Sequence, residues 1–291
     1  MVTFSSRKEA AEVSDWILAH EPQVRIGFFL GILVLMALWE IAAPRRPLTV
    51  SKGSRWGNNL GLVLIDTLAL RFLLPANAVT TAVLIQQHGW GILNNLSISY
   101  GLAVVLGVAV LDLTIYLQHA MFHAIPTLWR LHRVHHTDLD LDVTTGVRFH
   151  PIEILLSMGI KMGAVTLLGA SPLAVILFEV LLNGTSLFNH GNVRLPRPMD
   201  RILRLVVVTP EMHRVHHSVV IQEHNSNFGF NFPWWDRFFG TYRDQPTAGH
   251  LAMTIGLAPF REPQRLTLLR LLILPFIVKP TQYPFYRRPD A

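Results

Sequence analysis

The five-residue string HRVHH occurs twice in this chain, at residues 132–136 and again at residues 213–217. Each copy carries three histidines within five positions. Residues at i, i+3 and i+4 share one face of an α-helix, so each copy can direct several imidazoles toward one point. A repeated string of this kind predicts a shared centre built from both copies.

Further histidines stand close to the two strings in the sequence. His119 and His123 form an i,i+4 pair, and His190 lies between the copies. Imidazole is the commonest metal ligand among side chains, whereas one tetrahedral zinc uses at most four protein ligands and a facial triad uses three. The pattern therefore predicts two metals, held by nine of the fourteen histidines: His119, His123, His132, His135, His136, His190, His213, His216 and His217.

The composition is that of a membrane protein. Of 291 residues, 51% are hydrophobic and only 15% are charged, against roughly 25% charged in an ordinary soluble domain. The absence of cysteine excludes disulfides, iron–sulfur clusters and thiolate metal sites within this chain. The net charge is +6, but the basic residues flank apolar segments, which favours a membrane surface and argues against a nucleic-acid partner.

Apolar stretches at residues 26–43, about 60–85, 100–118 and 152–188 alternate with polar segments. The last stretch is interrupted by the string GASP at residues 169–172, which suits a helical hairpin, either spanning or re-entrant. We therefore expect an all-α, polytopic membrane protein with about four transmembrane helices, the last two as a hairpin. Residues 1–291 are expected to form one integral membrane domain.

The positive-inside rule orients these helices. The loop after the first stretch carries Arg45, Arg46, Lys52 and Arg55 and no acid, so we expect it in the cytoplasm. A hairpin returns the chain to the side it left, which the second HRVHH string requires in order to meet the first. The histidine-rich helical region is therefore predicted on the cytoplasmic face of a membrane of the bacterial inner membrane or endoplasmic reticulum type. The apolar run 266–278 is too short to span and is predicted to be interfacial or packing.

Several polar residues are candidates to hydrogen-bond the ligating imidazoles. Asp112 lies two helical turns before His119, where it could accept from an imidazole or, equally, pair with Arg71. His150 is favoured as a helix cap or a donor behind the ligands, and His224 is expected at the surface. The alternating acids Asp138, Asp140 and Asp142 slightly favour a solvated loop. The candidate hydrogen-bond partners are Asp112, Asp138, His150, Asn189, Glu211 and Asn225.

An imidazole-rich, carboxylate-poor site for two metals fits iron that binds O2, although the ligand types alone leave zinc hydrolysis open. Neither HExxH nor GxSxG occurs, so neither a zinc-protease helix nor a nucleophile elbow is indicated. Position at a membrane face suggests a lipid substrate whose tail enters between helices. The alternatives are a histidine-rich membrane metal transporter or metal-binding protein, which needs ligands at several depths, and a structural protein with a degenerate site.

Over residues 105–245, the succession HxxxH, HxxHH, a single NH and a second HxxHH resembles the fatty acid hydroxylase/sterol desaturase superfamily of membrane di-iron oxygenases. The strings TPEMHRVHHS and WWDRFFGTY are most similar to bacterial members and to the alkylglycerol monooxygenase branch. Fatty acid hydroxylases of the family carry a further cluster of two histidines where this chain has only His190.

The resemblance implies a cytoplasm-facing site in which the nine histidines ligate two irons, with O2 as co-substrate. It implies hydroxylation or desaturation of a fatty acyl, sterol or ether-lipid substrate, with electrons from a separate ferredoxin, b-type cytochrome or reductase. One oxidant serves hydroxylation, desaturation and ether cleavage alike, so the sequence leaves the outcome open.

Overall fold

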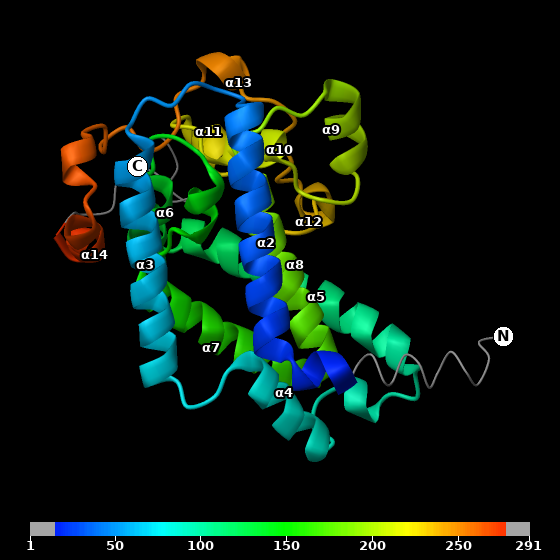
Figure 1. Cartoon of the computed structure of the whole chain (residues 1–291). Helices are drawn as coiled ribbons and strands as arrows, with labels where there is room; N and C mark the ends of the chain where they lie inside the picture. Colours follow the sequence, from blue (N-terminus) through cyan, green and yellow to red (C-terminus); the bar gives the residue numbers. More distant parts are fainter. Residues whose placement is uncertain (1–14, 278–291) are drawn as a thin grey trace.

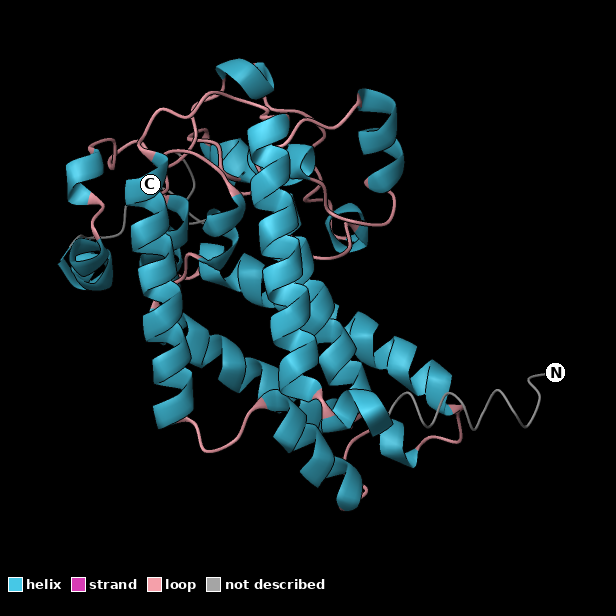
Figure 2. Cartoon of the chain, in the orientation of Figure 1, coloured by secondary structure: helices cyan, strands magenta, loops and turns pink. Residues whose placement is uncertain are grey.

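The computed structural model describes residues 15–277, and the regular secondary structure of this part of the chain is helical. Figure 2 shows helices joined by loops, with no strand drawn within the described residues. Antiparallel pairing there is limited to isolated bridges between Pro44 and Val193 and between Ser218 and Ile255. The predicted all-α fold class is confirmed.

Long apolar helices make up the lower part of the molecule in Figure 1. They are α2 (Glu21–Ala42), α3 (Lys52–Leu73) continued by α4 (Ala78–Gln87), α5 (Tyr100–Ala124), α7 (Pro151–Leu168) and α8 (Pro172–Asn189). Five segments among the described residues are long and apolar enough to cross a membrane: Glu21–Ala42, Lys52–Gln87, Tyr100–Ala124, Pro151–Leu168 and Pro172–Asn189. The expected count of about four is therefore corrected to five.

The predicted count already included both arms of the hairpin, so the additional span is among the three segments before it, Glu21–Ala42, Lys52–Gln87 and Tyr100–Ala124. The hairpin itself follows the prediction. Each of its helices has 18 residues, or roughly 27 Å at 1.5 Å per residue, which approaches the thickness of a bilayer core. Gly169 ends α7 in the left-handed conformation (φ +71°), which a residue without a Cβ adopts at no steric cost. Ser171 then caps α8 by accepting from the backbone N–H of Ala174. Both arms are thus long and apolar enough to cross a membrane.

The shorter helices gather at one end of the long ones, where α2 ends and α3 begins (Figure 1). They are α6 (Pro126–His136), α9 (Arg197–Leu203), α10 (Pro210–His216), α11 (Ile221–His224), α12 (Trp234–Phe238) and α13 (Gly249–Ala252), with 3-10 turns at Val143–Val147 and Pro263–Arg265. A further 3-10 turn, Leu93–Asn95, lies at the opposite end, between α4 and α5. Because α7 leaves this end and α8 returns to it, both HRVHH strings lie on the same side of the helical bundle.

Packing between the long helices leaves apolar side chains on the outside. Helix α8 packs against α2 and α5, while α3 and α4 pack against α7. Leu35, Ile41 and Phe72 remain more than half exposed, as suits contact with lipid. Helix α14 (Leu268–Ile277) is too short to span and buries Leu271 and Leu274 against α3 and α6. Residue 278 of the predicted interfacial run lies outside the described residues.

Candidate metal centre

The nine histidines singled out from the sequence are all buried and lie in two groups. One group holds His119, His123, His132, His136 and His216, and the other holds His135, His190, His213 and His217. Within each group, one nitrogen of every ring lies within 4.8 Å of one nitrogen of every other ring. The groups adjoin, since the rings of His136 and His217 stack with centroids 4.5 Å apart.

Each HRVHH string divides its histidines between the two groups. From the first string, His132 and His136 enter the five-membered group and His135 enters the other. The second string does the reverse: His216 belongs to the five-membered group, and His213 and His217 belong to the four-membered group. At about 100° per residue, i and i+4 lie 40° apart while i+3 falls 60° away on the opposite side. The expectation that one string serves one point is therefore corrected: the two copies exchange roles across both groups.

The Nδ1 atoms of six of the nine rings are held by acceptors behind the site. The Nδ1–H groups of His119 and His216 donate to the carbonyls of Phe228 and Ser226, both at 2.7 Å. Those of His135 and His190 donate to the carbonyls of Arg148 (3.1 Å) and Ser186 (2.7 Å). His132 and His123 use side-chain oxygens, Glu153 Oε1 at 2.6 Å and Asn225 Oδ1 at 3.2 Å. Such bonds fix the ring tautomer and leave Nε2 as the ligand atom.

The Nε2 atoms that point toward the centre of each group are suited to bind a cation between them. His135 and His190 each carry a hydrogen on Nδ1, so in the neutral rings both Nε2 atoms bear lone pairs, yet these atoms lie 3.1 Å apart. The Nε2 atoms of His119, His123 and His216 are buried and have no hydrogen-bond partner within residues 15–277. Buried nitrogens of this kind are costly unless something binds them, and metal ions bind such lone pairs. The donor set therefore fits metal ions at both groups.

Burial keeps these imidazoles neutral, which is the form that binds metals. It lowers the pKa of His132 to about 3 and that of His190 to about 4. The pKa values of His213 and His217 fall well below the usual range for the same reason, with neighbouring imidazoles adding to the effect. Protons do not compete with a metal at neutral pH.

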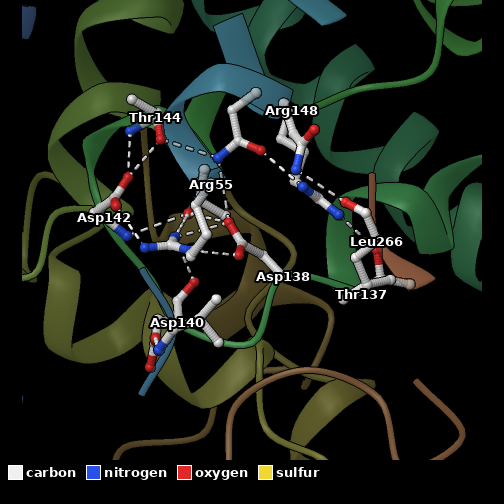
Figure 3. A network of polar contacts seen from close by, with 12 residues as sticks. Arg55, Thr137, Asp138, Asp140, Asp142, Thr144, Arg148 and Leu266 are labelled. Atoms are coloured by element: carbon white, nitrogen blue, oxygen red, sulfur yellow. Dashed lines mark hydrogen bonds and ion pairs between the residues drawn. The ribbon is translucent and has the colours of Figure 1, made fainter. Parts of the chain in front are cut away.

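A buried ion-pair network orients α6 and the loop after it (Figure 3). Arg55 on α3 donates from Nε and Nη2 to the two oxygens of Asp138, at 2.6 and 2.8 Å, and from Nη1 to Asp142 at 2.5 Å. Asp140 accepts from the backbone N–H groups of Thr49 and Val50. The expectation of a solvated loop for the three acids is wrong, because they are buried against α3. The network connects the start of α3 to the chain that carries the first HRVHH string.

Arg148 completes this arrangement. It donates from Nη1 to the Oδ1 of Asn59 at 2.7 Å and from Nε to the carbonyl of Val134 at 2.9 Å (Figure 3). Its own carbonyl accepts from His135. The same residue thus holds the C-terminal turn of α6 and one of the rings that α6 carries.

Of the six predicted hydrogen-bond partners, Asn225 is the one whose side chain meets a clustered histidine among the hydrogen bonds described. Asp112 instead accepts from Trp235 Nε1 at 2.8 Å and does not pair with Arg71, whose side chain is exposed. Asp138 pairs with Arg55, as above. Asn189 donates to the carbonyl of Phe230 at 3.1 Å.

The other two candidates, Glu211 and His150, also contact residues other than the nine clustered histidines. Glu211 forms ion pairs with Arg45 at 2.6 Å, Arg214 at 3.1 Å and His250 at 3.0 Å. Burial acts to raise the pKa of Glu211, but His250 and the two arginines outweigh it and lower the pKa to about 2. His150 caps α7, with Nδ1 accepting from the backbone N–H of Ile152 at 3.2 Å.

Two residues at the site were missed or misplaced from the sequence. Glu153, in the first turn of α7, was not among the predicted partners, although its position three residues after His150 was a usable signal of a helix start. His224 is fully buried rather than on the surface, with its ring centroid 4.3 Å from that of His136 and 4.8 Å from that of His123. His224 is only seven residues after His217, but the polar string EHNSN around it favoured a surface position.

A cavity of about 270 Å³ reaches the five-membered group from the membrane part of the bundle. It lies between α2, α3, α5, α7 and α8, and His119 and His132 form part of its wall. Apolar side chains such as Ile115, Phe122 and Phe230 line it nearby. The site therefore opens toward the region that lipid would occupy.

Comparison with known proteins agrees with this geometry. Residues 104–241 match the fatty acid hydroxylase family. The predicted family resemblance is confirmed. The region is similar to an ornithine lipid hydroxylase of Rhizobium tropici (37% identity, 49% of this chain, 42% of the relative) and to the human cholesterol 25-hydroxylase (28%, 48% and 51%). It is also similar to the alkylglycerol monooxygenase of Xenopus tropicalis (29%, 45% and 28%).

These matches cover about half of this chain and between about a quarter and a half of each relative just named. No solved structure matches the chain. The matched region, residues 104–241, holds all nine clustered histidines, and the apolar helices support a multi-pass membrane protein.

Proposed function

We propose that this chain is an O2-dependent, non-heme di-iron oxidoreductase that hydroxylates or desaturates a fatty acyl, sterol or ether-lipid substrate. The observation that carries the proposal is the pair of adjacent, buried, all-imidazole groups at the inner end of a cavity that opens into the membrane bundle. Residues 105–245 would form the catalytic region of one integral membrane domain. The nine clustered histidines would hold the irons, and a separate ferredoxin, b-type cytochrome or reductase would supply electrons.

The donor set supports iron. Imidazole suits iron as well as zinc, but a group of five rings exceeds the four ligands of a structural zinc site. The nine rings lie in two adjoining groups, whereas a metal transporter would need ligands at several depths along a path. When bound, the irons would supply the activation of O2 that attack on a C–H bond requires.

The residues of this chain would orient the metals and keep the site dry. Glu153 and the carbonyls of Phe228, Arg148, Ser186 and Ser226 hold the rings in fixed positions. The apolar wall of the cavity would exclude water from the reacting carbon. A site on the cytoplasmic face is supported by Arg45, Arg46 and Lys52, which lie at the same end of the helices as the histidines.

The test is oxidation of lipid by the purified, iron-loaded protein. Incubation with O2, a reductase system and a lipid extract should yield, by mass spectrometry, a lipid that has gained one oxygen or lost two hydrogens. His190→Ala should abolish the product. If wild type carries two irons and consumes no O2 with any lipid class, the oxygenase proposal is wrong. Metal uptake into vesicles would then support the transporter alternative.

A further inference from the structure

The cavity holds five ionisable groups in addition to the histidines. Arg25 and Lys161 are cationic, and Asp66, Glu153 and Glu179 are acidic. Charges inside a membrane bundle are costly unless paired, and unpaired ones usually mark a substrate or ion site. The partners of each group therefore indicate what the cavity is built to receive.

Four of the five groups have partners within the chain. Glu179 binds both cations, with Lys161 Nζ at 2.6 Å and Arg25 Nη2 at 3.2 Å. Arg25 also pairs with Glu21 at 2.6 Å. Glu153 accepts from the Nδ1 of His132, so a cation on that ring would compensate its charge. Each of these four groups therefore has an ion-pair or hydrogen-bond partner within the chain.

Asp66 is the exception. It lies on α3 at the fourth position of an inward-facing row, after Arg55, Asn59 and Leu62. Asp66 is only 7% exposed, and its Oδ1 atom is buried without a hydrogen-bond partner among residues 15–277. Neither of the two cations that line the cavity is paired with it. An inward-facing carboxylate in an apolar bundle needs a positive partner to offset its desolvation.

We propose that Asp66 binds the protonated amine of an amine-bearing lipid and thereby determines which carbon of that lipid reaches the metal centre. This inference rests on the proposed function for the identity of the cavity as a substrate site. Asp66 is the ionisable group of the cavity for which the described residues provide no ion pair or hydrogen bond, and its single carboxylate matches one ammonium group. His119 and His132 line the same cavity, so a lipid anchored at Asp66 presents a carbon to the five-membered group. At about 270 Å³ the cavity is near the lower limit for a ligand site, so it holds the head region while the tail lies between helices.

Binding can be measured without any turnover. Full-length protein in detergent is titrated with dodecylamine, 1-dodecanol or dodecanoate in the absence of reductant, and retained ligand is counted by native mass spectrometry. Wild type should retain dodecylamine at least about tenfold more tightly than the other two probes, because a buried charge pair is lost with either. Asp66→Asn should remove this preference, and Asp66→Glu should keep most of it. Glu262→Gln, an exposed acid, serves as the matched control.

Two results would overturn the inference. One is wild-type binding of dodecanol or dodecanoate as tight as that of dodecylamine, a comparison that stands even if Asp66→Asn fails to fold. The other is a folded Asp66→Asn variant, with unchanged circular dichroism, that still prefers the amine. Because no oxidation is measured, an inactive protein that prefers the amine would contradict the proposed function and leave this inference standing.

Discussion

The Nε2 atoms of His135 and His190 face one another at 3.1 Å, while the Nδ1–H of each ring is already donated to a backbone carbonyl. Neither Nε2 of the neutral rings can donate to the other. Two lone pairs directed at one another at this distance repel unless a cation lies between or beside them. This relationship, between residues 55 positions apart in the chain, is the sharpest structural sign of a metal at the four-membered group.

Loss of one ring from the four-membered group should remove one metal. His135→Ala should lower the iron content from about two per chain toward one, because three imidazoles remain. His216→Ala should retain more iron, because the other group keeps four rings. Metal analysis after anaerobic loading measures both. Combining the two changes should reduce activity little beyond the worse single variant, since ligands of one centre act as a unit. Additive partial activities would contradict a shared centre.

Glu153 should tune metal affinity through His132. Glu153→Gln keeps the shape of the side chain but removes its charge, and losses behind a ligand typically reduce metal affinity or activity by roughly 10–100-fold. Competition with a chelator measures the change in affinity. Glu262→Gln, at an exposed ion pair, should leave it unaltered. Equal chelator sensitivity in the two variants would show that the His132–Glu153 contact is not functional.

Arg55 should be needed for stability. Arg55→Met leaves Asp138 and Asp142 buried without their cation, and breaking a buried pair by removing one partner costs about 3–5 kcal/mol. A lower thermal unfolding midpoint in detergent is the expected result. Arg265→Met, at an ion pair whose side chains are 68% and 60% exposed, should change stability by at most about 1 kcal/mol. Comparable losses of stability in both variants would show that the buried network contributes no more to folding than an exposed ion pair.

The metal-free protein should lose stability as pH falls below neutrality. The folded pKa values of His132 and His190 are about 3 and about 4, below the ordinary value of 6.5 that the unfolded chain regains. Between these limits the unfolded chain binds protons that the folded chain excludes, so lower pH favours unfolding. The unfolding midpoint should drop between pH 7.5 and pH 5.5. A midpoint that stays level or rises over this range would show that these rings are protonated in the fold.

The two ends of the bundle should label from opposite sides of the membrane. The chain has no native cysteine, so single cysteines report cleanly. Glu262→Cys, near the histidine-bearing end, should react with an impermeant thiol reagent from the cytoplasm. Trp90→Cys, between α4 and α5 and 59% exposed, should react from the other side. Labelling of both from one side would contradict the five-span arrangement.

Much of the site could be predicted from local spacing. The i, i+3, i+4 pattern of HRVHH, and the i,i+4 pair His119 and His123, place rings on one side of a helix whatever surrounds it. The eight histidines chosen this way meet in the structure, together with the single His190. The hairpin was likewise predictable, because Gly169 and Pro172 interrupt an apolar run long enough for two helices. Periodicity and chain breakers act within a few residues and can be read without the fold.

The tertiary structure alone decided how the rings divide and what holds them. The i+3 ring of each string falls about 100° from the i+4 ring, but which metal group each one reaches depends on how α6, α8 and α10 pack. The partners of Asp138 and His119 come from Arg55, 83 positions away, and Phe228, 109 positions away. The burial of His224 and Asp66 depends on the same packing. Contacts between distant segments follow from how whole helix faces fit together, which local spacing does not encode.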